Sequence, residues 1–302
     1  MAFEKLMQFA RSEDIPLWEN EPLRDHTTFR IGGPARYFAQ PLHTGQLIAL
    51  LAFVKVNDLP YAVIGKGSNL LVPDEGFDGL VIRTSEDFPH WHEDGCTVTV
   101  SSGYAMTRLS AEAAKRGLAG LTFAQGIPGT VGGAVVMNAG AYGGQIADTL
   151  VSSRYVDEDG LHTLSAREHD LSYRHSVYAD HPDWVCVDAT FRLTPGDKVQ
   201  IEAEMADYAQ RRRDKQPLEW PSAGSTFKRP EGHFAGKLIE DAGLKGFSVG
   251  DAQVSEKHAG FVINRGGATF EDMLSLMAHI SKTVYDRTGI PLEPEVKIIR
   301  EI

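Results

Sequence analysis

The chain of 302 residues is 42% apolar and 24% charged, which is typical of a globular protein of about two domains. Its formal charge of −11, from 30 basic and 41 acidic side chains, argues against general nucleic-acid binding, because affinity for a phosphate backbone depends on basic surfaces. No apolar run reaches the roughly 18 residues of a transmembrane helix, and the first residues mix acidic with apolar side chains, which is not the pattern of a signal peptide.

The first third of the chain predicts a strand, a helix and a second strand. Gly32-Gly33-Pro34 marks a turn, and the ARYFAQP segment that begins at residue 35 follows it as a short strand. Thr44 is expected to cap a helix that ends at Asn57 to Pro60, because apolar residues recur there at helical spacing. The buried strand expected at residues 61–64 runs directly into a glycine-rich turn, GKGSNLLV, at residues 65–72.

The middle third predicts mainly strands. We expect strands at residues 79–83, 96–101 and 184–193, with a helix at residues 107–116 that Gly117 ends. Between them, residues 124–143 (AQGIPGTVGGAVVMNAGAYG) are rich in glycine and alanine and contain no charged side chain. Next comes a hairpin that turns at Asp159-Gly160, then a loop at residues 170–180, and residues 194–197 form the expected linker to a further domain.

The last third predicts two helices that flank a run of strands and turns. The first helix spans residues 199–215 and ends in Arg211, Arg212, Arg213 and Lys215, which suit either a solvated helix end or a ligand phosphate. Strands and turns are expected at residues 237–264. A long helix then opens with a capping box, Thr269 and Asp272, carries its methionines on a core-facing apolar stripe and ends at Gly289. Residues 292–302 (LEPEVKIIREI) are expected to form a last strand.

Two glycine-rich segments, at residues 65–72 and 124–143, are the strongest candidates for a ligand site. Glycine lets backbone N–H groups approach an anionic group such as a pyrophosphate without interference from a Cβ atom. Neither segment has the spacing of a Walker loop or the GxGxxG fingerprint of dinucleotide-binding folds. The alternatives are two loops that clasp one extended cofactor, or tight turns packed against neighbouring backbone.

Eight segments in the same order resemble the UDP-N-acetylenolpyruvoylglucosamine reductases of bacterial cell-wall synthesis. They are TTFRIGGPA, GKGSNLLV, GIPGTVGGAVVMNAGAYG, YRHS, AGSTFKRP, KLIEDAGL, VSEKHAGFVIN and LEPEVKII. The resemblance implies an α+β fold: a two-lobed FAD-binding domain of the vanillyl-alcohol-oxidase (PCMH) type, and a C-terminal α+β substrate-binding domain. We expect lobes at residues 1–83 and 84–196 and the third domain at 197–302. The short spacing between Gly246 and Asn264 resembles the shorter, second type of this family.

The resemblance also implies a reaction. NADPH reduces non-covalently bound FAD, and the reduced FAD then reduces the enolpyruvyl ether of UDP-N-acetylglucosamine enolpyruvate to UDP-N-acetylmuramate. Arg174 would stabilise the enolate, Ser225 would protonate the α-carbon, and Glu295 would assist protonation. Glu293 is the neighbouring alternative to Glu295. A flavin oxidase on the same fold, and a nucleotide-binding module without redox chemistry, are the competing hypotheses.

Further site residues are carried over from the same motifs. The expected FAD-binding residues are Gly65, Lys66, Gly67, Ser68, Asn69, Leu70, Ile127, Pro128, Gly129, Thr130, Val131, Gly132, Gly133, Ala134, Asn138, Ala139, Gly140 and Ala141. The expected substrate-binding residues are Tyr142, Tyr173, Arg229, Lys257 and His258. The 11 histidines show no metal-ligand spacing, and Cys96 and Cys186 are expected in the core of a reduced, cytosolic protein. We expect a monomer that binds neither metal, nucleic acid nor membrane.

Overall fold

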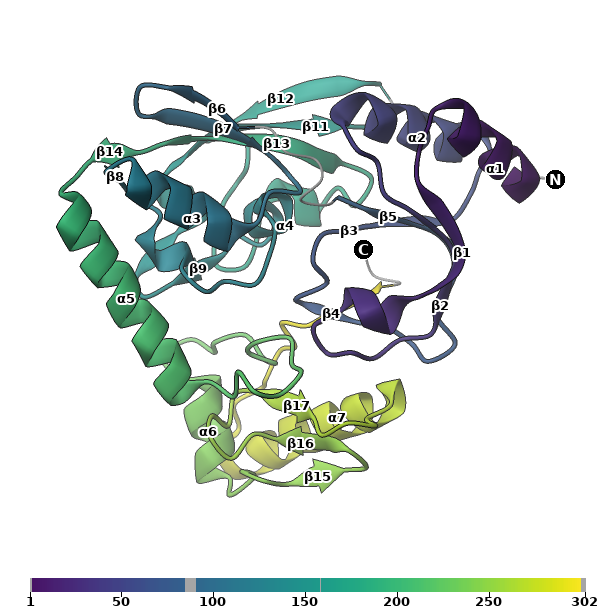
Figure 1. Ribbon diagram of the computed structural model, residues 1–302. Helices are drawn as coiled ribbons and strands as arrows, with labels where there is room; N and C mark the ends of the chain where they lie inside the picture. Colours follow the sequence, from purple (N-terminus) through teal and green to yellow (C-terminus); the bar gives the residue numbers. More distant parts are fainter. Residues whose placement is uncertain (1, 85–90, 158, 300–302) are drawn as a thin grey trace. The chain divides into compact units, whose positions relative to one another are not determined.

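The computed structural model describes residues 2–84, 91–157 and 159–299 (Figure 1). The chain divides into two compact units, which are described separately below. Unit 1 comprises Met1–Glu19, Tyr37–Lys66 and Gly79–Arg211; unit 2 comprises Asn20–Arg36, Gly67–Asp78 and Arg212–Ile302. Among the described residues, no helix combines the length and apolarity needed to cross a membrane. The three domains expected from the sequence stay a prediction.

The first sheet has four strands in the order β1-β2-β5-β3, and two helices pack with it. The strands are β1 (Leu17–Pro22), β2 (Pro34–Ala39), β5 (Phe77–Arg83) and β3 (Tyr61–Ile64). β3 and β5 run parallel, with Tyr61 opposite Leu80. The helices α1 (Ala2–Ser12) and α2 (Thr44–Val56) contact each other through Phe9 and Phe53, whose rings stack at 4.4 Å. Their apolar faces share a core with β3 and β5.

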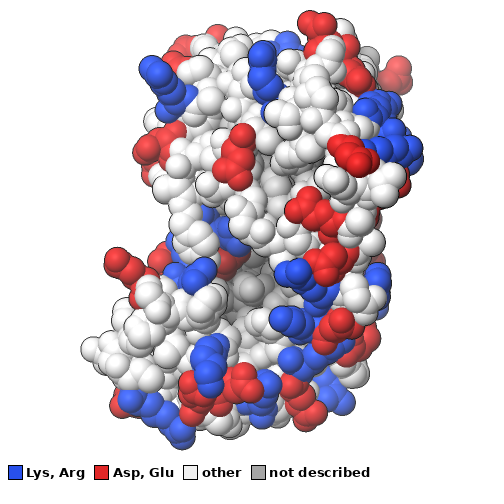
Figure 2. Space-filling model, turned by 90° about the vertical axis from the view of Figure 1, so that its left-hand side faces the viewer, with Lys and Arg blue, Asp and Glu red and all other residues white. Residues whose placement is uncertain are grey.

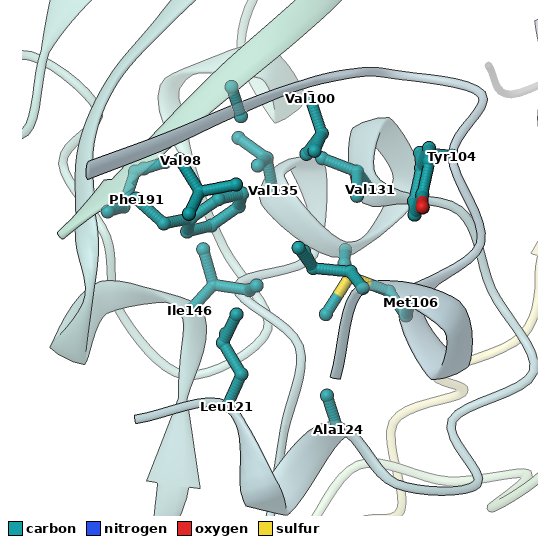
Figure 3. Close-up of a cluster of buried hydrophobic side chains, with 14 of the residues drawn as sticks. Val98, Val100, Tyr104, Met106, Leu121, Ala124, Val131, Val135, Ile146 and Phe191 are labelled. Atoms are coloured by element: carbon teal, nitrogen blue, oxygen red, sulfur yellow. The ribbon is translucent and has the colours of Figure 1, made fainter. Parts of the chain in front are cut away.

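A second sheet in unit 1 is antiparallel, with the order β12-β11-β13-β7-β6. Its strands are β12 (Leu161–Ser165), β11 (Leu150–Val156), β13 (Val185–Arg192), β7 (Thr97–Ser101) and β6 (Trp91–Asp94). Two helices, α3 (Met106–Lys115) and α4 (Val131–Val136), contribute to the same core. Figure 3 shows Val131 and Val135 of α4 pointing toward Val98, Val100 and Phe191 of the sheet.

Short elements complete unit 1. They are β8 (Leu118–Ala119) paired with β14 (Thr194–Pro195), β9 (Gly140–Ala141) paired with β10 (Gly144–Gln145), and the 3-10 turns Thr122–Ala124, Ile146–Asp148 and Val177–Ala179. Helix α5 (Lys198–Lys215) buries Ile201 and Met205. Its exposed sides carry ion pairs such as Arg211–Asp207. Figure 2 shows acidic and basic side chains interspersed over one face of the protein.

Unit 2 is built around α7 (Phe270–Thr288), which packs on the three-stranded antiparallel sheet β15-β16-β17. The strands are β15 (Ser248–Val249), β16 (Ala252–Val254) and β17 (Val262–Asn264), and α6 (Ala235–Asp241) contributes to the same core. β4 (Leu70–Leu71) pairs in parallel with β18 (Lys297–Ile298), and a 3-10 turn spans Leu23–His26. The core includes Met273 and Met277, as predicted for the methionines.

The structure confirms the longer predicted elements and corrects several details. His43, not Thr44, caps α2, because its Nδ1 atom accepts a hydrogen bond from the N–H of Gln46 at 3.2 Å. Residues 237–241, expected among strands and turns, belong to helix α6. The last strand is only two residues long, and residues 300–302 of its predicted range lie outside the described residues. Cys186 is buried as predicted, whereas Cys96 is partly exposed.

Candidate functional site

The two glycine-rich segments meet within unit 1. Gly65 directly follows β3, and a Cβ atom on Gly65 would lie only 2.3 Å from the hydroxyl oxygen of Thr130, the N-cap of α4. The end of β3 and the start of the Gly-Ala segment are therefore in contact, although they lie far apart in the sequence. Glycine is required at position 65 because the side chain of Thr130 leaves no room for a Cβ atom.

Backbone N–H groups at the start of α4 donate to the protein itself. The N–H of Val131 donates to the carbonyl of Tyr104, and that of Gly132 to the carbonyl of Ser102, both at 2.8 Å. The N–H of Gly133 donates to the hydroxyl of Thr130. These contacts hold α4 against the segment after β7, so the glycines here serve close backbone packing. These N–H groups are therefore not available to an anionic ligand. Any N–H groups that converge on an anion must belong to other residues of the two segments.

Two buried hydroxyl groups beside these segments have no protein partner. The Oγ atom of Ser102 and the Oγ1 atom of Thr28 are inaccessible to solvent, and neither has a hydrogen-bond partner. Ser102 touches the Gly-Ala segment, since a Cβ atom on Gly132 would lie 2.8 Å from its Cβ atom. In unit 2, the N–H of Thr28 donates to the carbonyl of Gly67 at 3.2 Å. Buried hydroxyls are normally paired, so both atoms are suited to a ligand. The sequence alone offered no signal for either.

The Gly-Ala segment also presents an exposed, uncharged edge. Gly126, Pro128 and Gly133 are exposed, while Thr130 and Val131 between them are buried. A Cβ atom on Gly133 would meet no atom closer than 3.6 Å, so the packing of the protein does not require glycine there. An edge made of backbone and small side chains suits the flat, uncharged ring of a flavin, and together with the unpaired hydroxyl of Ser102 in the same unit it fits FAD.

Arg174 lies beside the same segment. Its Nη2 atom donates to the carbonyl of Gly140 at 3.3 Å, and its guanidinium lies 5.0 Å from the centre of the Tyr173 ring. The backbone of Arg174 has a φ of 57°, which is uncommon for a residue other than glycine. Asn138 supports this region, because its side-chain amide donates to the carbonyl of Ser172 at 2.9 Å and its oxygen accepts from the N–H of Ala147 at 3.0 Å.

Unit 2 brings Ser225 and Glu295 onto adjacent backbone segments. The N–H of Glu295 donates to the carbonyl of Thr226, the residue after Ser225, at 2.9 Å. The turn at residues 67–70 joins them, since the Nδ2 atom of Asn69 donates to the carbonyl of Glu295 at 2.9 Å. Ser225 is exposed and Glu295 is half-buried. A hydroxyl and a carboxyl group thus lie on neighbouring segments next to one of the predicted cofactor turns.

The two neighbouring glutamates differ in their surroundings. The carboxylate of Glu293 is exposed and forms an ion pair with Lys228. The backbone of this residue belongs to the same pairing, because the N–H of Lys228 donates to its carbonyl at 2.8 Å. An exposed carboxylate with a cationic partner is less suited to proton transfer, which counts against Glu293.

The predicted substrate residues fall into separate groups. In unit 1, the exposed Tyr142 stacks on Tyr208 of α5 with ring centres 4.3 Å apart. In unit 2, Arg229 lies with its guanidinium 3.9 Å from the centre of the exposed Phe234 ring. The sequence predicted neither Tyr208 nor Phe234 as a partner, because ring contacts across a turn or between elements leave no local pattern.

Lys257 and His258 occupy the loop between β16 and β17. The Nζ atom of Lys257 donates to the carbonyl of Arg213 at 2.6 Å. The Nδ1 atom of His258 accepts from the N–H of Gly260 at 3.1 Å, and burial lowers the pKa of His258. This loop lies next to the segment of Ser225, because the carbonyl of Gly260 accepts from the N–H of Thr226.

Comparison with known proteins identifies the family. Residues 216–299 match the family model of the C-terminal domain of UDP-N-acetylenolpyruvoylglucosamine reductase, and residues 35–165 match that of an FAD binding domain. The UDP-N-acetylenolpyruvoylglucosamine reductase of Agathobacter rectalis is 50% identical, and the match covers 96% of this chain and 97% of that protein. The UDP-N-acetylenolpyruvoylglucosamine reductase of Clostridium perfringens is 46% identical, and the match covers 99% of this chain and 98% of that protein.

A solved structure agrees with these matches. The crystal structure of UDP-N-acetylenolpyruvylglucosamine reductase from Thermus caldophilus is 35% identical, with a TM-score of 0.79, and the match covers 94% of this chain and 98% of that one. The predicted fold class, with an FAD-binding domain and a C-terminal domain, is confirmed. The chain therefore belongs to the UDP-N-acetylenolpyruvoylglucosamine reductase family of FAD-binding oxidoreductases.

Proposed function

We propose that the chain reduces UDP-N-acetylglucosamine enolpyruvate to UDP-N-acetylmuramate in the synthesis of peptidoglycan precursors, with NADPH as the source of electrons. The observation that carries the proposal is the pairing of the two segments that hold Ser225 and Glu295, with the N–H of Glu295 bonded to the carbonyl of Thr226. Family membership over nearly the whole chain supports the same substrate.

FAD fits unit 1 through the exposed uncharged edge of the Gly-Ala segment and through the unpaired hydroxyl of Ser102. Residues Gly65–Leu70, Ile127–Ala134 and Asn138–Ala141 would hold it, with Asn138 acting through the backbone that it supports. Bound there, the cofactor would supply hydride transfer from NADPH to the β-carbon of the enolpyruvyl group.

The residues of the chain complete the addition of hydrogen. Addition of hydride at the β-carbon breaks the C=C bond and places negative charge on the α-carbon and the adjoining carboxylate. The guanidinium of Arg174 stabilises that charge through its two-pronged fork of N–H donors. The hydroxyl of Ser225 donates a proton to the α-carbon, and Glu295 assists this transfer and the return of a proton to the serine.

The UDP-sugar is proposed to contact five side chains, those of Tyr142, Tyr173, Arg229, Lys257 and His258. A cytoplasmic, monomeric enzyme is proposed, and the free state of Cys96 and Cys186 is consistent with a reducing compartment.

Separate measurement of the two half-reactions tests the proposal. The purified protein should show a flavin spectrum that bleaches with NADPH and recovers with the enolpyruvyl substrate. Ser225→Ala should keep the bleaching step and slow the recovery by about 10²- to 10⁴-fold, because a proton donor is lost. Ser222→Ala, in the same segment, is the matched control and should recover normally. A protein that binds no FAD would refute the function; equal loss of both half-reactions in Ser225→Ala would refute the role of the serine.

A further inference from the structure

A buried polar network lies beneath the segment that carries Arg174. The Oγ atom of Ser153, on β11, lies 2.8 Å from the Nε2 atom of His169 and 2.6 Å from the hydroxyl of Tyr178. Their exposed fractions are 1% for Ser153, 0% for His169 and 3% for Tyr178. The reaction proposed above uses none of these three side chains, and no predicted site residue is among them.

The partners of the network assign its hydrogens. The Nδ1 atom of His169 lies 2.7 Å from the carbonyl of Ser165, which can only accept, so Nδ1 carries the hydrogen. Burial lowers the pKa of His169, so the ring is neutral and its Nε2 atom accepts. Ser153 therefore donates to His169 and accepts from the hydroxyl of Tyr178. The Ser153 hydroxyl and the His169 ring thus each have one defined orientation, and no buried polar atom of the three side chains is left unpaired.

The network holds both ends of one loop, defined here as the Arg174 loop (residues 170–177). His169 precedes the loop and Tyr178 follows it, and the N–H of Val177 donates to the carbonyl of His169 at 2.7 Å. Ser153 on the sheet thus bonds to both ends of the loop at once. Within the loop, Ser176 donates to the carbonyl of Val136 at 2.7 Å.

Arg174 needs such support. Its φ of 57° lies in a region that side chains other than glycine rarely adopt, and such a conformation persists only where the surroundings over-determine it. Apolar side chains of similar shape could fill the space of Ser153, His169 and Tyr178 at little cost in stability. A fully paired network adds what apolar packing does not, namely one defined position for both ends of the loop.

We propose that Ser153, His169 and Tyr178 are positioning residues for the guanidinium of Arg174 in the reduction of the substrate. The inference rests on the proposed role of Arg174. Loss of the Ser153 hydroxyl would leave the Nε2 atom of His169 without its partner and would remove the bond between the sheet and the Tyr178 hydroxyl, and the loop ends would shift. A displacement of about 1 Å at a charge-stabilising group lowers a rate by about ten- to hundredfold.

A double-mutant cycle on the FAD-loaded enzyme tests this. The flavin is reduced chemically under anaerobic conditions and mixed with UDP-N-acetylglucosamine enolpyruvate, and the rate of flavin reoxidation is followed by absorbance. Ser153→Ala should slow reoxidation by about ten- to hundredfold, but by less than about twofold when Arg174 is already replaced by Ala. The flavin spectrum and FAD content should match the wild type. Ser110→Ala, which removes a buried hydroxyl bonded to the carbonyl of Leu121 elsewhere in unit 1, is the matched control and should react at the normal rate.

The outcomes separate the inference from the function on which it rests. If wild-type reduced enzyme is not reoxidised by the substrate, the proposed function fails. If the wild type reacts but Ser153→Ala does so equally fast, or slows equally in both backgrounds, the positioning role is wrong. Tyr178→Phe, which removes one hydroxyl and keeps the ring, gives the same test should Ser153→Ala not fold. It should slow reoxidation only when Arg174 is present.

Discussion

Replacement of Ser102 by Ala should have opposite effects on the protein with and without FAD. Ser102 is 1% exposed, and its Oγ atom has no hydrogen-bond partner, so folding without FAD removes that hydroxyl from water with no compensation. An unpaired buried hydroxyl costs about 1–3 kcal/mol. The gain from its removal is reduced by the small void that the missing oxygen leaves.

The net result for the FAD-free protein is a gain of about 1 kcal/mol, which raises Tm by about 2–4 °C for a domain of this size. With FAD bound as proposed, the same substitution removes one hydrogen bond to the cofactor. A bond worth about 1.4 kcal/mol corresponds to a tenfold weaker Kd. Calorimetric melting of the FAD-free protein and titration with FAD measure the two effects separately.

Ser110→Ala provides the matched control, because Ser110 is 2% exposed in the same unit and its hydroxyl donates to the carbonyl of Leu121 at 2.8 Å. That substitution should lower the stability of the FAD-free protein by about 1 kcal/mol and leave the Kd for FAD unchanged. If Ser102→Ala destabilises the FAD-free protein as Ser110→Ala does, the hydroxyl of Ser102 has a partner within the protein and the reasoning is wrong.

Gly67→Ala should lower the free energy of unfolding of the FAD-free protein, measured in urea, by about 2–4 kcal/mol. Position 67 has a φ of 59°, and the added Cβ atom would lie 2.1 Å from the carbonyl oxygen of His26. A loss below about 1 kcal/mol would contradict this. Gly133→Ala should keep or raise the stability of the FAD-free protein, since the new methyl group meets nothing closer than 3.6 Å. The same substitution should weaken FAD binding, measured by titration, if the exposed edge of the Gly-Ala segment holds the cofactor. Burial lowers the pKa of His169 in the folded protein below 6.5, so the neutral ring contributes stability above about pH 6.5, and this stability is lost as the pH falls. The drop in Tm between pH 7.5 and pH 5.5 should therefore be smaller in His169→Gln than in the wild type. An equal drop in both proteins would show that His169 does not contribute. Thr269→Ala should cost about 1 kcal/mol by loss of the α7 cap, and an unchanged urea midpoint would count against the capping box.

The long elements were predictable because local chemistry defines them. Helix α7 has a capping box at Thr269 and Asp272, an apolar stripe over five turns, and Gly289 in the left-handed conformation at its end. The start of α2 was misassigned because a histidine ring nitrogen can accept the capping bond that Thr44 was expected to accept. Sequence patterns therefore locate such a helix well, whereas its first residue depends on the side chain that happens to reach the free N–H group.

The short helices were not predictable in the same way. Helix α6 has seven residues and no side-chain cap, and α4 has six residues, two of them glycine. Neither is long enough to show a period, and both are held by tertiary contacts: Ile239 and Val135 are fully buried. The residues that form these helices are apparent only once the surrounding core is known.

The contacts around the candidate site residues were not predictable from the sequence. Motif resemblance supplied Arg174, Ser225 and Glu295, and the structure adds that Glu295 is paired by backbone with the segment of Ser225. The contact of Gly65 with Thr130 joins residues far apart in the chain, so no local pattern distinguishes a packed glycine from one that faces a ligand. The network at Ser153 escaped prediction for the same reason.

The parallel pairing of β4 with β18 has a consequence for synthesis of the protein on the ribosome. Leu70–Leu71 cannot complete this pairing until Lys297–Ile298, which follow much later in the chain, have been made. At about 5–20 residues per second, that delay is on the order of 10–50 s. The turn that carries Asn69 precedes β4 directly, so it cannot take its final form until this later segment has been made.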